Sequence, residues 1–177
     1  FNQKSVYAYY YILENAIFYG DLNLVEGKII SAKGSLISNK SYKYKGELIR
    51  NFTKESDNSE LIIIDDTDVF RLEGKYVDDE FIHGEIYHSV RDGDDENNQE
   101  KCIYKGDIKD SSFNQGISYY STSEKYLGSF KKNMRDGKGN YKYPNGDTFD
   151  GIWKEDEPIK GIFKKKNEKI YSKIVFE

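Results

Sequence analysis

A five-residue cassette returns at a short, regular interval near the end of the chain. Residues 126–130 read YLGSF, and 23 residues later residues 149–153 read FDGIW. In an extended strand alternate side chains share a face, so the two aromatic residues of each cassette lie on the same side as the central glycine. A short internal period is typical of repeat proteins, in which each unit packs on its neighbours. This period constrains the fold more than any other feature.

The segment between the two cassettes predicts a β-hairpin. Residues 131–136 are polar and are expected to form its loop, and small and aromatic residues then alternate from Gly137 to Tyr143 as a second strand. Pro144-Asn145-Gly146-Asp147 predicts the turn to the next hairpin, because proline presets one turn dihedral and Asn-Gly tolerates positive φ. We expect the cassette glycines to leave room for an aromatic ring from the adjacent strand. The glycines assigned this structural role are Gly46, Gly74, Gly106, Gly128, Gly137, Gly139 and Gly151.

The pattern Tyr-x-Gly-x-Phe/Trp, then Gly-x-Gly, then Asn-Gly-Asp, resembles the MORN repeat family. The resemblance is clear in residues 125–163 and degenerate elsewhere. We assign further cassettes near residues 18–22, 44–48, 72–76 and 104–108, with insertions at 50–60 and 91–100. The predicted fold is all-β, an elongated antiparallel meander of about six MORN-like β-hairpin repeats forming one domain over residues 1–177. Because residue 1 is phenylalanine, we expect a fragment of a longer chain.

The composition excludes several classes of protein. Apolar residues make up only 37% of the chain while aromatic residues make up 15%, which suits an array whose rings supply most of the buried area. The net charge of −4 argues against a nucleic-acid partner. Cys102 is the sole cysteine, so an internal disulfide framework is excluded and a cytoplasmic location is expected.

The residues that could support catalysis or metal binding do not converge in the sequence. His83 and His88 are the two histidines, and their odd spacing places them on opposite faces of a strand. The acidic run from Asp92 to Glu96 suggests a calcium loop, but the twelfth position counted from Asp92 is Ile103 rather than glutamate. We therefore predict no enzyme activity, no metal and no cofactor.

Charge is unevenly distributed along the chain. Residues 65–80 contain seven acids and two bases, whereas residues 125–143 contain six bases and one acid. Basic clusters attract anionic headgroups by about 1 kcal/mol per Lys or Arg near the surface. The candidate lipid-binding residues are Lys131, Lys132, Arg135 and Lys138, and a solvated loop in a lysine-rich protein is the alternative.

The aromatic stripe also has two interpretations. The rings pack as a core, and the apolar surface that the chain does not cover itself is covered by a partner, commonly an amphipathic helix. We expect both to hold, on different residues. The candidate partner-binding residues are Tyr104, Tyr126, Phe130, Tyr141, Tyr143, Phe149 and Trp153.

The resemblance implies a non-catalytic scaffold that binds a partner protein or a second copy of itself, at a membrane–cytoskeleton junction. Two alternatives stay open at this stage. The chain could be a peripheral module that binds anionic phospholipids, or the regulatory segment of an enzyme whose catalytic domain lies outside these residues.

Overall fold

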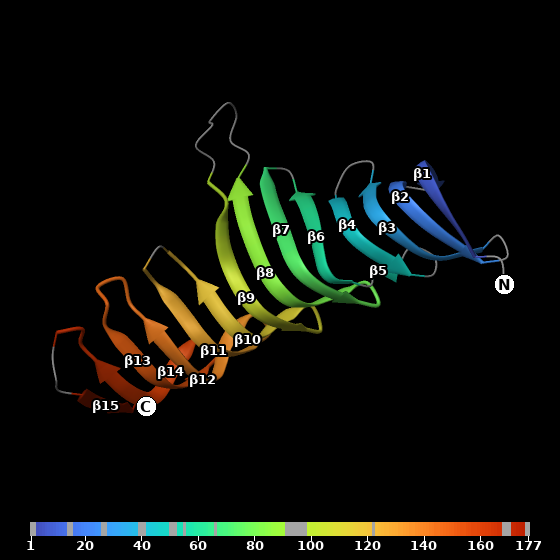
Figure 1. Cartoon of the computed structure of the whole chain (residues 1–177). Helices are drawn as coiled ribbons and strands as arrows, with labels where there is room; N and C mark the ends of the chain where they lie inside the picture. Colours follow the sequence, from blue (N-terminus) through green and yellow to red (C-terminus); the bar gives the residue numbers. More distant parts are fainter. Residues whose placement is uncertain are drawn as a thin grey trace. The chain divides into compact units, whose positions relative to one another are not determined.

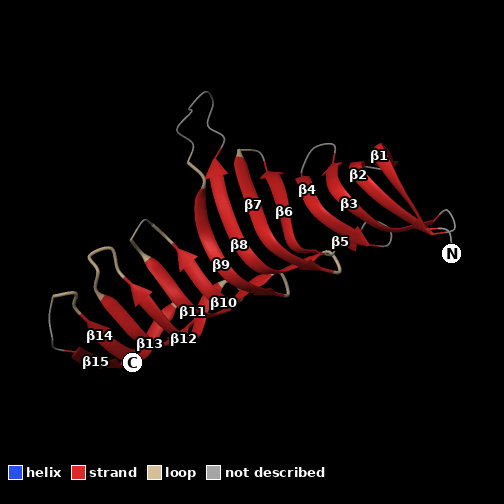
Figure 2. Cartoon of the chain, in the orientation of Figure 1, coloured by secondary structure: helices blue, strands red, loops and turns tan. Residues whose placement is uncertain are grey.

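The computed structural model describes residues 3–13, 16–25, 28–38, 42–49, 53–54, 56–65, 67–90, 99–121, 123–167 and 171–175. These residues form β-strands, turns and short loops, and no helix occurs among them (Figure 2). The chain divides into two compact units, Phe1–Lys101 and Cys102–Glu177.

The first unit is an antiparallel meander in which successive strands pair, except that the two-residue strand β5 lies beside β4 and β4 goes on to pair with β6. Residues 50–60, assigned as an insertion, contain β5 and the first half of β6. The strands are β1 (Gln3–Leu13), β2 (Ala16–Val25), β3 (Lys28–Ser38), β4 (Tyr42–Ile49), β5 (Thr53–Lys54), β6 (Ser56–Asp65), β7 (Asp68–Val77) and β8 (Glu80–Val90) (Figure 1).

In the second unit every strand pairs with the next one along the chain, always antiparallel. The prediction of an all-β antiparallel meander is therefore confirmed. The strands are β9 (Lys101–Lys109), β10 (Ser112–Tyr119), β11 (Lys125–Lys131), β12 (Met134–Lys142), β13 (Thr148–Lys154), β14 (Glu157–Lys164) and β15 (Tyr171–Val175) (Figure 1).

The hairpin turns are tighter than the sequence suggested. The polar segment 131–136 was expected to be a loop, but β11 continues to Lys131 and β12 begins at Met134. Only Lys132 and Asn133 remain between them, with φ of 53° and 64°. Two successive residues with positive φ are the signature of a type I′ turn, whose twist matches that of the flanking strands. The Asn145-Gly146 turn occurs as predicted, with φ of +89° at Gly146.

Glycines line up across the second unit. Backbone pairing joins one glycine from each of six successive strands, namely Gly106, Gly116, Gly128, Gly139, Gly151 and Gly161. The tyrosine of the cassette lies over this row: a Cβ on Gly139 would stand 2.2 Å from Cζ of Tyr126. The expected ring from the adjacent strand is thus found at Gly139. At Gly128 the expectation is wrong, because there the hydroxyl of Tyr126, from the same strand, lies 2.6 Å from the Cβ position.

In each unit, the face that carries the paired glycines is called the inner face, and it also carries the buried side chains. In three cassettes the tyrosine hydroxyl donates a hydrogen bond to the backbone carbonyl three residues later. These bonds run from Tyr44 to Glu47 at 3.0 Å, from Tyr104 to Asp107 at 2.8 Å and from Tyr126 to Ser129 at 3.1 Å. The bond holds each ring flat along its own strand, which explains why the third cassette position has no side chain.

The turns themselves are connected from one hairpin to the next. In three of them the second turn residue, an aspartate or an asparagine, accepts a hydrogen bond from a backbone N–H of the preceding hairpin. The bonds are Lys54 N to Asp79 at 2.8 Å, Phe113 N to Asn133 at 2.8 Å, and Arg135 N to Asp156 at 2.9 Å. Asp and Asn tolerate the left-handed conformation that the turn requires. One residue therefore shapes its own turn and fixes the neighbouring hairpin.

Candidate functional site

The aromatic residues predicted to bind a partner lie on the inner face of the second unit. Tyr143 is half-buried, and the other six are at most 8% exposed. They pack on one another mostly edge to face, with ring centroids 5.0 Å apart for Tyr126 and Phe130 and 5.5 Å apart for Tyr126 and Trp153. Such pairs contribute about 0.5–1.5 kcal/mol each beyond their buried area. These rings therefore form the core, and little of their surface is open to a partner.

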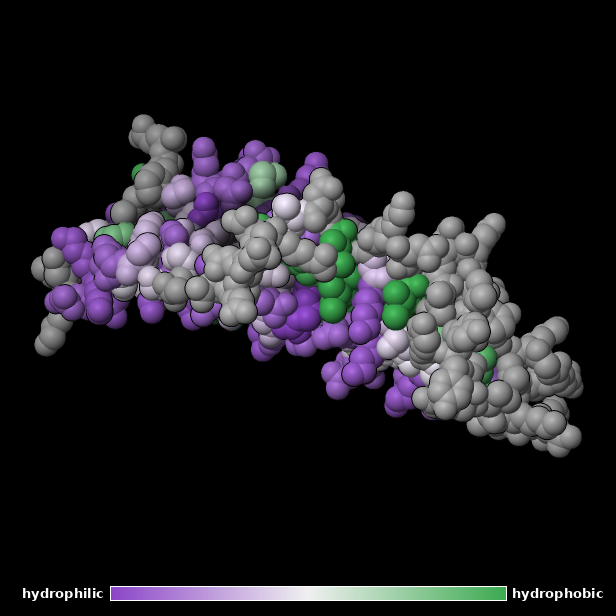
Figure 3. All heavy atoms as spheres, turned by 90° about the horizontal axis from the view of Figure 1, so that it is seen from above, coloured by the Kyte–Doolittle hydropathy of each residue, from purple (hydrophilic) through white to green (hydrophobic). Residues whose placement is uncertain are grey.

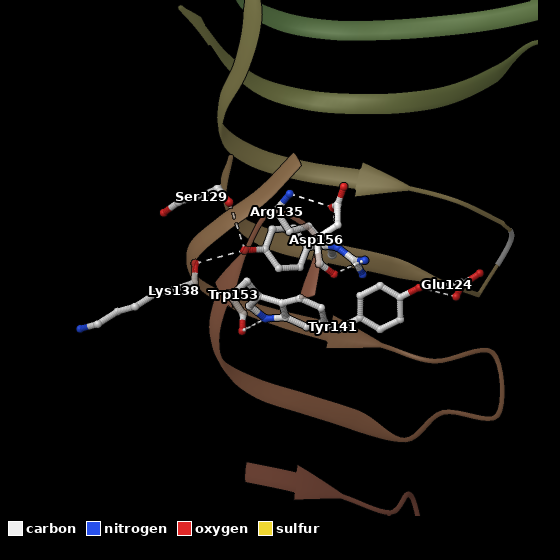
Figure 4. A network of polar contacts seen from close by, with 9 residues as sticks. Glu124, Ser129, Arg135, Lys138, Tyr141, Trp153 and Asp156 are labelled. Atoms are coloured by element: carbon white, nitrogen blue, oxygen red, sulfur yellow. Dashed lines mark hydrogen bonds and ion pairs between the residues drawn. The ribbon is translucent and has the colours of Figure 1, made fainter. Parts of the chain in front are cut away.

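Burial changes the acidity of the core tyrosines. It raises the pKa of Tyr104 to about 12 and that of Tyr126 to about 12, because the phenolate would lose its hydration. The positive charge of Arg135 acts in the opposite direction on Tyr126. Burial likewise raises the pKa of Tyr141, whose hydroxyl donates a hydrogen bond to the carboxylate of Glu124 (Figure 4).

Arg135, one of the four predicted lipid-binding residues, is hydrogen-bonded to Asp156 and packs on the ring of Trp153. Its backbone N–H and its Nε both donate to Oδ1 of Asp156 at 2.9 Å, and its guanidinium also reaches the backbone oxygen of that residue at 2.8 Å (Figure 4). The guanidinium carbon lies 4.4 Å from the ring centroid of Trp153 and 5.0 Å from that of Tyr141. Its side chain is only 19% exposed. The arginine thus covers the edge of the aromatic core.

The other three predicted lipid-binding residues are exposed, on a different side of the sheet. Lys132 lies in the turn between β11 and β12. Lys131 and Lys138 point to the outer face, since Lys138 pairs with Ile152 while its neighbour Gly139 pairs with Gly151 on the inner face. The sequence-predicted quartet therefore does not converge, because Arg135 pairs with Phe130 on the inner face and Lys138 lies on the opposite one.

The outer side of β11–β14 carries a concentration of lysines that sequence reasoning missed. Among the residues that pair across these strands on this face, seven are lysines and two are acids. We call this surface the lysine face. Its lysines are Lys125, Lys131, Lys138, Lys142, Lys154, Lys160 and Lys164, and its acids are Asp150 and Glu157.

The lysine face contains a charge arrangement that works against folding. Lys125 and Lys142 are direct cross-strand partners, and like charges in that position destabilise a sheet. Within the described residues, Lys125, Lys138 and Lys142 make no ion pair with a carboxylate. Leu127 and Ile162 lie between the lysine rows and are 51% and 49% exposed. In the row between the lysines, these two apolar side chains lie on either side of Asn140 and Asp150.

The signal that could have revealed this face was present in the sequence. Lysines recur at even spacings within a strand, which places them on one face, as in Lys125 and Lys131 on β11 and Lys138 and Lys142 on β12. Only the pairing register shows that they lie side by side. In the view of Figure 3, described side chains are mostly hydrophilic, and hydrophobic ones occur in small patches.

The histidines lie as the sequence analysis expected. His83 pairs with Lys75 on the outer face, whereas His88 pairs with Phe70 on the inner face and approaches Oδ1 of Asp68 at 2.6 Å. Among the residues that the structure describes, no group of three His, Cys, Asp or Glu side chains could hold a metal ion. The acidic run from Asp92 to Glu96 lies outside the described residues. The same part of the chain offers no helix long and apolar enough to span a membrane.

Comparison with known families confirms the resemblance seen in the sequence. Residues 126–148 match the MORN repeat, the stretch that begins with the cassette tyrosine on β11 and ends at the first residue of β13. A search of curated proteins found no match to the chain. MORN repeats are modules for protein interaction or membrane binding, and the family is generally non-catalytic.

Proposed function

We propose that the second unit, which contains the MORN repeat at residues 126–148, is a non-catalytic module that binds anionic membrane surfaces through the lysine face. The observation that carries this proposal is the direct pairing of Lys125 with Lys142 on a face with seven lysines and two acids. An arrangement that costs folding energy is compensated when an anionic surface lies against it.

The size of the effect follows from the number of lysines. Each Lys near an anionic bilayer contributes about 1 kcal/mol, so three of them contribute roughly 3 kcal/mol, or about a hundredfold in affinity. Exposed Leu127 and Ile162 would add contact with the boundary of the acyl chains, while the lysine stems extend around them. The attraction falls with ionic strength, because these charges are open to solvent.

The structure suggests a revision of the residues involved. Arg135 is replaced by Lys125 and Lys142, since its own charge is already paired with Asp156. Lys138 is kept, and Lys131 and Lys132 lie at the edge of the same surface.

The test is co-sedimentation with vesicles containing phosphoinositides or phosphatidylserine, at low and at physiological salt. The variant is Lys125→Glu/Lys138→Glu/Lys142→Glu. A matched control reverses three exposed lysines on the outer face of the first unit, Lys33, Lys43 and Lys45. We expect the wild type and the control to bind at physiological salt, and the lysine-face variant to stay in solution. Equal binding by the two variants would contradict the proposal.

A protein partner is the second candidate function, because Tyr120 lies at the edge of the aromatic core and is 49% exposed. Its ring stacks on that of Tyr141 with centroids 5.9 Å apart. A partner helix would contact this edge and Tyr143 rather than the buried rings. If Tyr120→Ala/Tyr143→Ala abolishes recruitment of the protein to membranes in cells, while vesicle binding is unchanged, this scaffold role is favoured over direct lipid contact.

A further inference from the structure

The outer face of the first unit carries the opposite charge. Glu60 on β6 pairs with Glu73 on β7, and Glu73 pairs with Glu85 on β8. Three carboxylates on successive strands thus form one line across the sheet, which we call the glutamate row. Its neighbour on β4 is Lys45.

Most of the cations near the glutamate row already have acidic partners. Arg71 contacts Glu73, and Glu100 holds it with two bonds of 2.8 Å and 2.6 Å. Lys75 pairs with Asp57 at 2.7 Å. Each of these cations is thus matched or outnumbered by carboxylates. The surroundings of the row therefore remain acidic.

The two units have opposite net charges. Residues 1–101 contain 12 basic and 20 acidic residues, a net charge of −8, whereas residues 102–177 contain 15 basic and 11 acidic residues, a net charge of +4. Both charged surfaces are outer faces of antiparallel sheet, where neighbouring strands lie about 4.8 Å apart. Lys125 and Lys142, which face each other on successive strands, therefore have the same lateral spacing as two neighbouring carboxylates of the glutamate row.

From this complementarity we infer that the lysine face of one copy docks on the glutamate row of a second copy. Charge complementarity steers such an encounter and fixes its register. Each copy contributes one surface of each sign, so the contact is heterologous, with different patches meeting. Exposed Leu127 and Ile162 would be covered together with the lysines. The inference shares the lysine face with the proposed membrane function without depending on it, and it makes anionic lipid and a second copy competitors.

The experiment is sedimentation velocity of the full chain over a range of protein concentrations, at about 50 mM and about 500 mM salt, where screening differs strongly. One variant reverses the glutamate row, Glu60→Lys/Glu73→Lys/Glu85→Lys. The other is the lysine-face variant Lys125→Glu/Lys138→Glu/Lys142→Glu. We expect the wild type to associate at low salt and dissociate at high salt. Each variant alone should sediment as a monomer, and an equimolar mixture should associate again.

Two outcomes would overturn the inference: a wild type that is monomeric at every concentration at low salt, or a glutamate-row variant that associates as the wild type does. Glu60→Gln/Glu73→Gln/Glu85→Gln removes the charge of the glutamate row without reversing it. This variant replaces the Glu→Lys variant of the row if the latter fails to fold. Vesicle binding separates the two proposals. The glutamate-row variant should bind anionic vesicles at least as well as the wild type, so loss of association with lipid binding intact concerns this inference alone.

Discussion

Replacing Gly139 with alanine tests whether the cassette tyrosine determines the glycine row. The new Cβ would lie 2.2 Å from both Cζ and the hydroxyl oxygen of Tyr126, where an ordinary contact needs at least 3.4 Å. The ring would have to move by roughly 1.2 Å. It has little freedom to do so, because Tyr126 is 0% exposed and packs edge to face on Phe130 and Trp153.

The cost can be bracketed from the contacts. Overpacking of a core usually costs about 1–3 kcal/mol, and full expulsion of a large aromatic ring about 3–5 kcal/mol. We expect about 3 kcal/mol for Gly139→Ala, since the shift also strains the hydrogen bond from Tyr126 to the Ser129 carbonyl. With an m-value of about 2 kcal/mol/M, the urea midpoint would fall by about 1.5 M.

The assay is urea unfolding followed by tryptophan fluorescence. Trp153 is the sole tryptophan of the chain and its ring lies 5.5 Å from that of Tyr126, so the signal reports on the second unit. Repeating the substitution in a Tyr126→Ala background completes a double-mutant cycle. If the ring is the obstacle, Gly139→Ala should cost at least 1 kcal/mol less in that background.

Two comparisons make the test decisive. Lys138→Ala changes the neighbouring exposed residue and should alter the free energy of unfolding by no more than about 0.5 kcal/mol. Gly128→Val should be severely destabilising even without the tyrosine ring, because its Cβ would also lie 2.5 Å from the backbone oxygen of Lys138. The reasoning is refuted if Gly139→Ala costs less than about 0.5 kcal/mol, or costs the same in both backgrounds.

Three further outcomes are expected. Asp156→Ala should lower the free energy of unfolding by about 1–2 kcal/mol, because it removes two hydrogen bonds to Arg135 and places alanine at φ 71°. Asp156→Asn should lower the free energy of unfolding by less than that. Urea unfolding measures both variants, and equal losses of stability would argue against the turn geometry. The raised pKa values of Tyr104 and Tyr126 mean that the folded state keeps these phenolic protons to higher pH than the unfolded state, so their contribution to stability is complete below pH 10 and is lost as the pH rises toward 12. Circular dichroism recorded together with tyrosinate absorbance should show unfolding and ionisation at the same pH. Ionisation of all tyrosines near pH 10 in a protein that stays folded would refute this. Tyr76→Phe should leave the stability unchanged or raise it by up to about 1 kcal/mol, because the buried hydroxyl of Tyr76 has no hydrogen-bond partner among the described residues. A clear drop in the thermal midpoint would contradict this expectation.

Much of the fold follows from local pattern. The alternation of aromatic residues and glycine in 126–130 identifies a strand and its buried face, because side chains alternate across an extended backbone. The Asn145-Gly146 turn was equally predictable, since few other residue pairs accept the required dihedrals. The tight turn at Lys132-Asn133 was missed, because lysine at positive φ is uncommon and nothing local announces it.

The candidate site was less predictable. Sequence proximity grouped Arg135 with Lys131, Lys132 and Lys138, and on that basis four neighbouring cations form one basic patch. The structure separates them, because the bulged register of β12 turns Arg135 toward Trp153 and Asp156. The charge of a side chain can be read from the sequence, but its available partners depend on which strand lies beside it.

By itself, the sequence determined that this chain is a β-sheet repeat protein with aromatic residues on one strand face and an uneven charge along its length, because hydrophobic period, turn residues and charge are properties of neighbouring residues. Only the tertiary structure decided that the rings are buried beneath one another, that Arg135 is a core-covering group, and that Lys125 lies directly against Lys142. Those outcomes depend on strand register, which a shift of one residue would reverse from face to face, and register is set by pairing between segments.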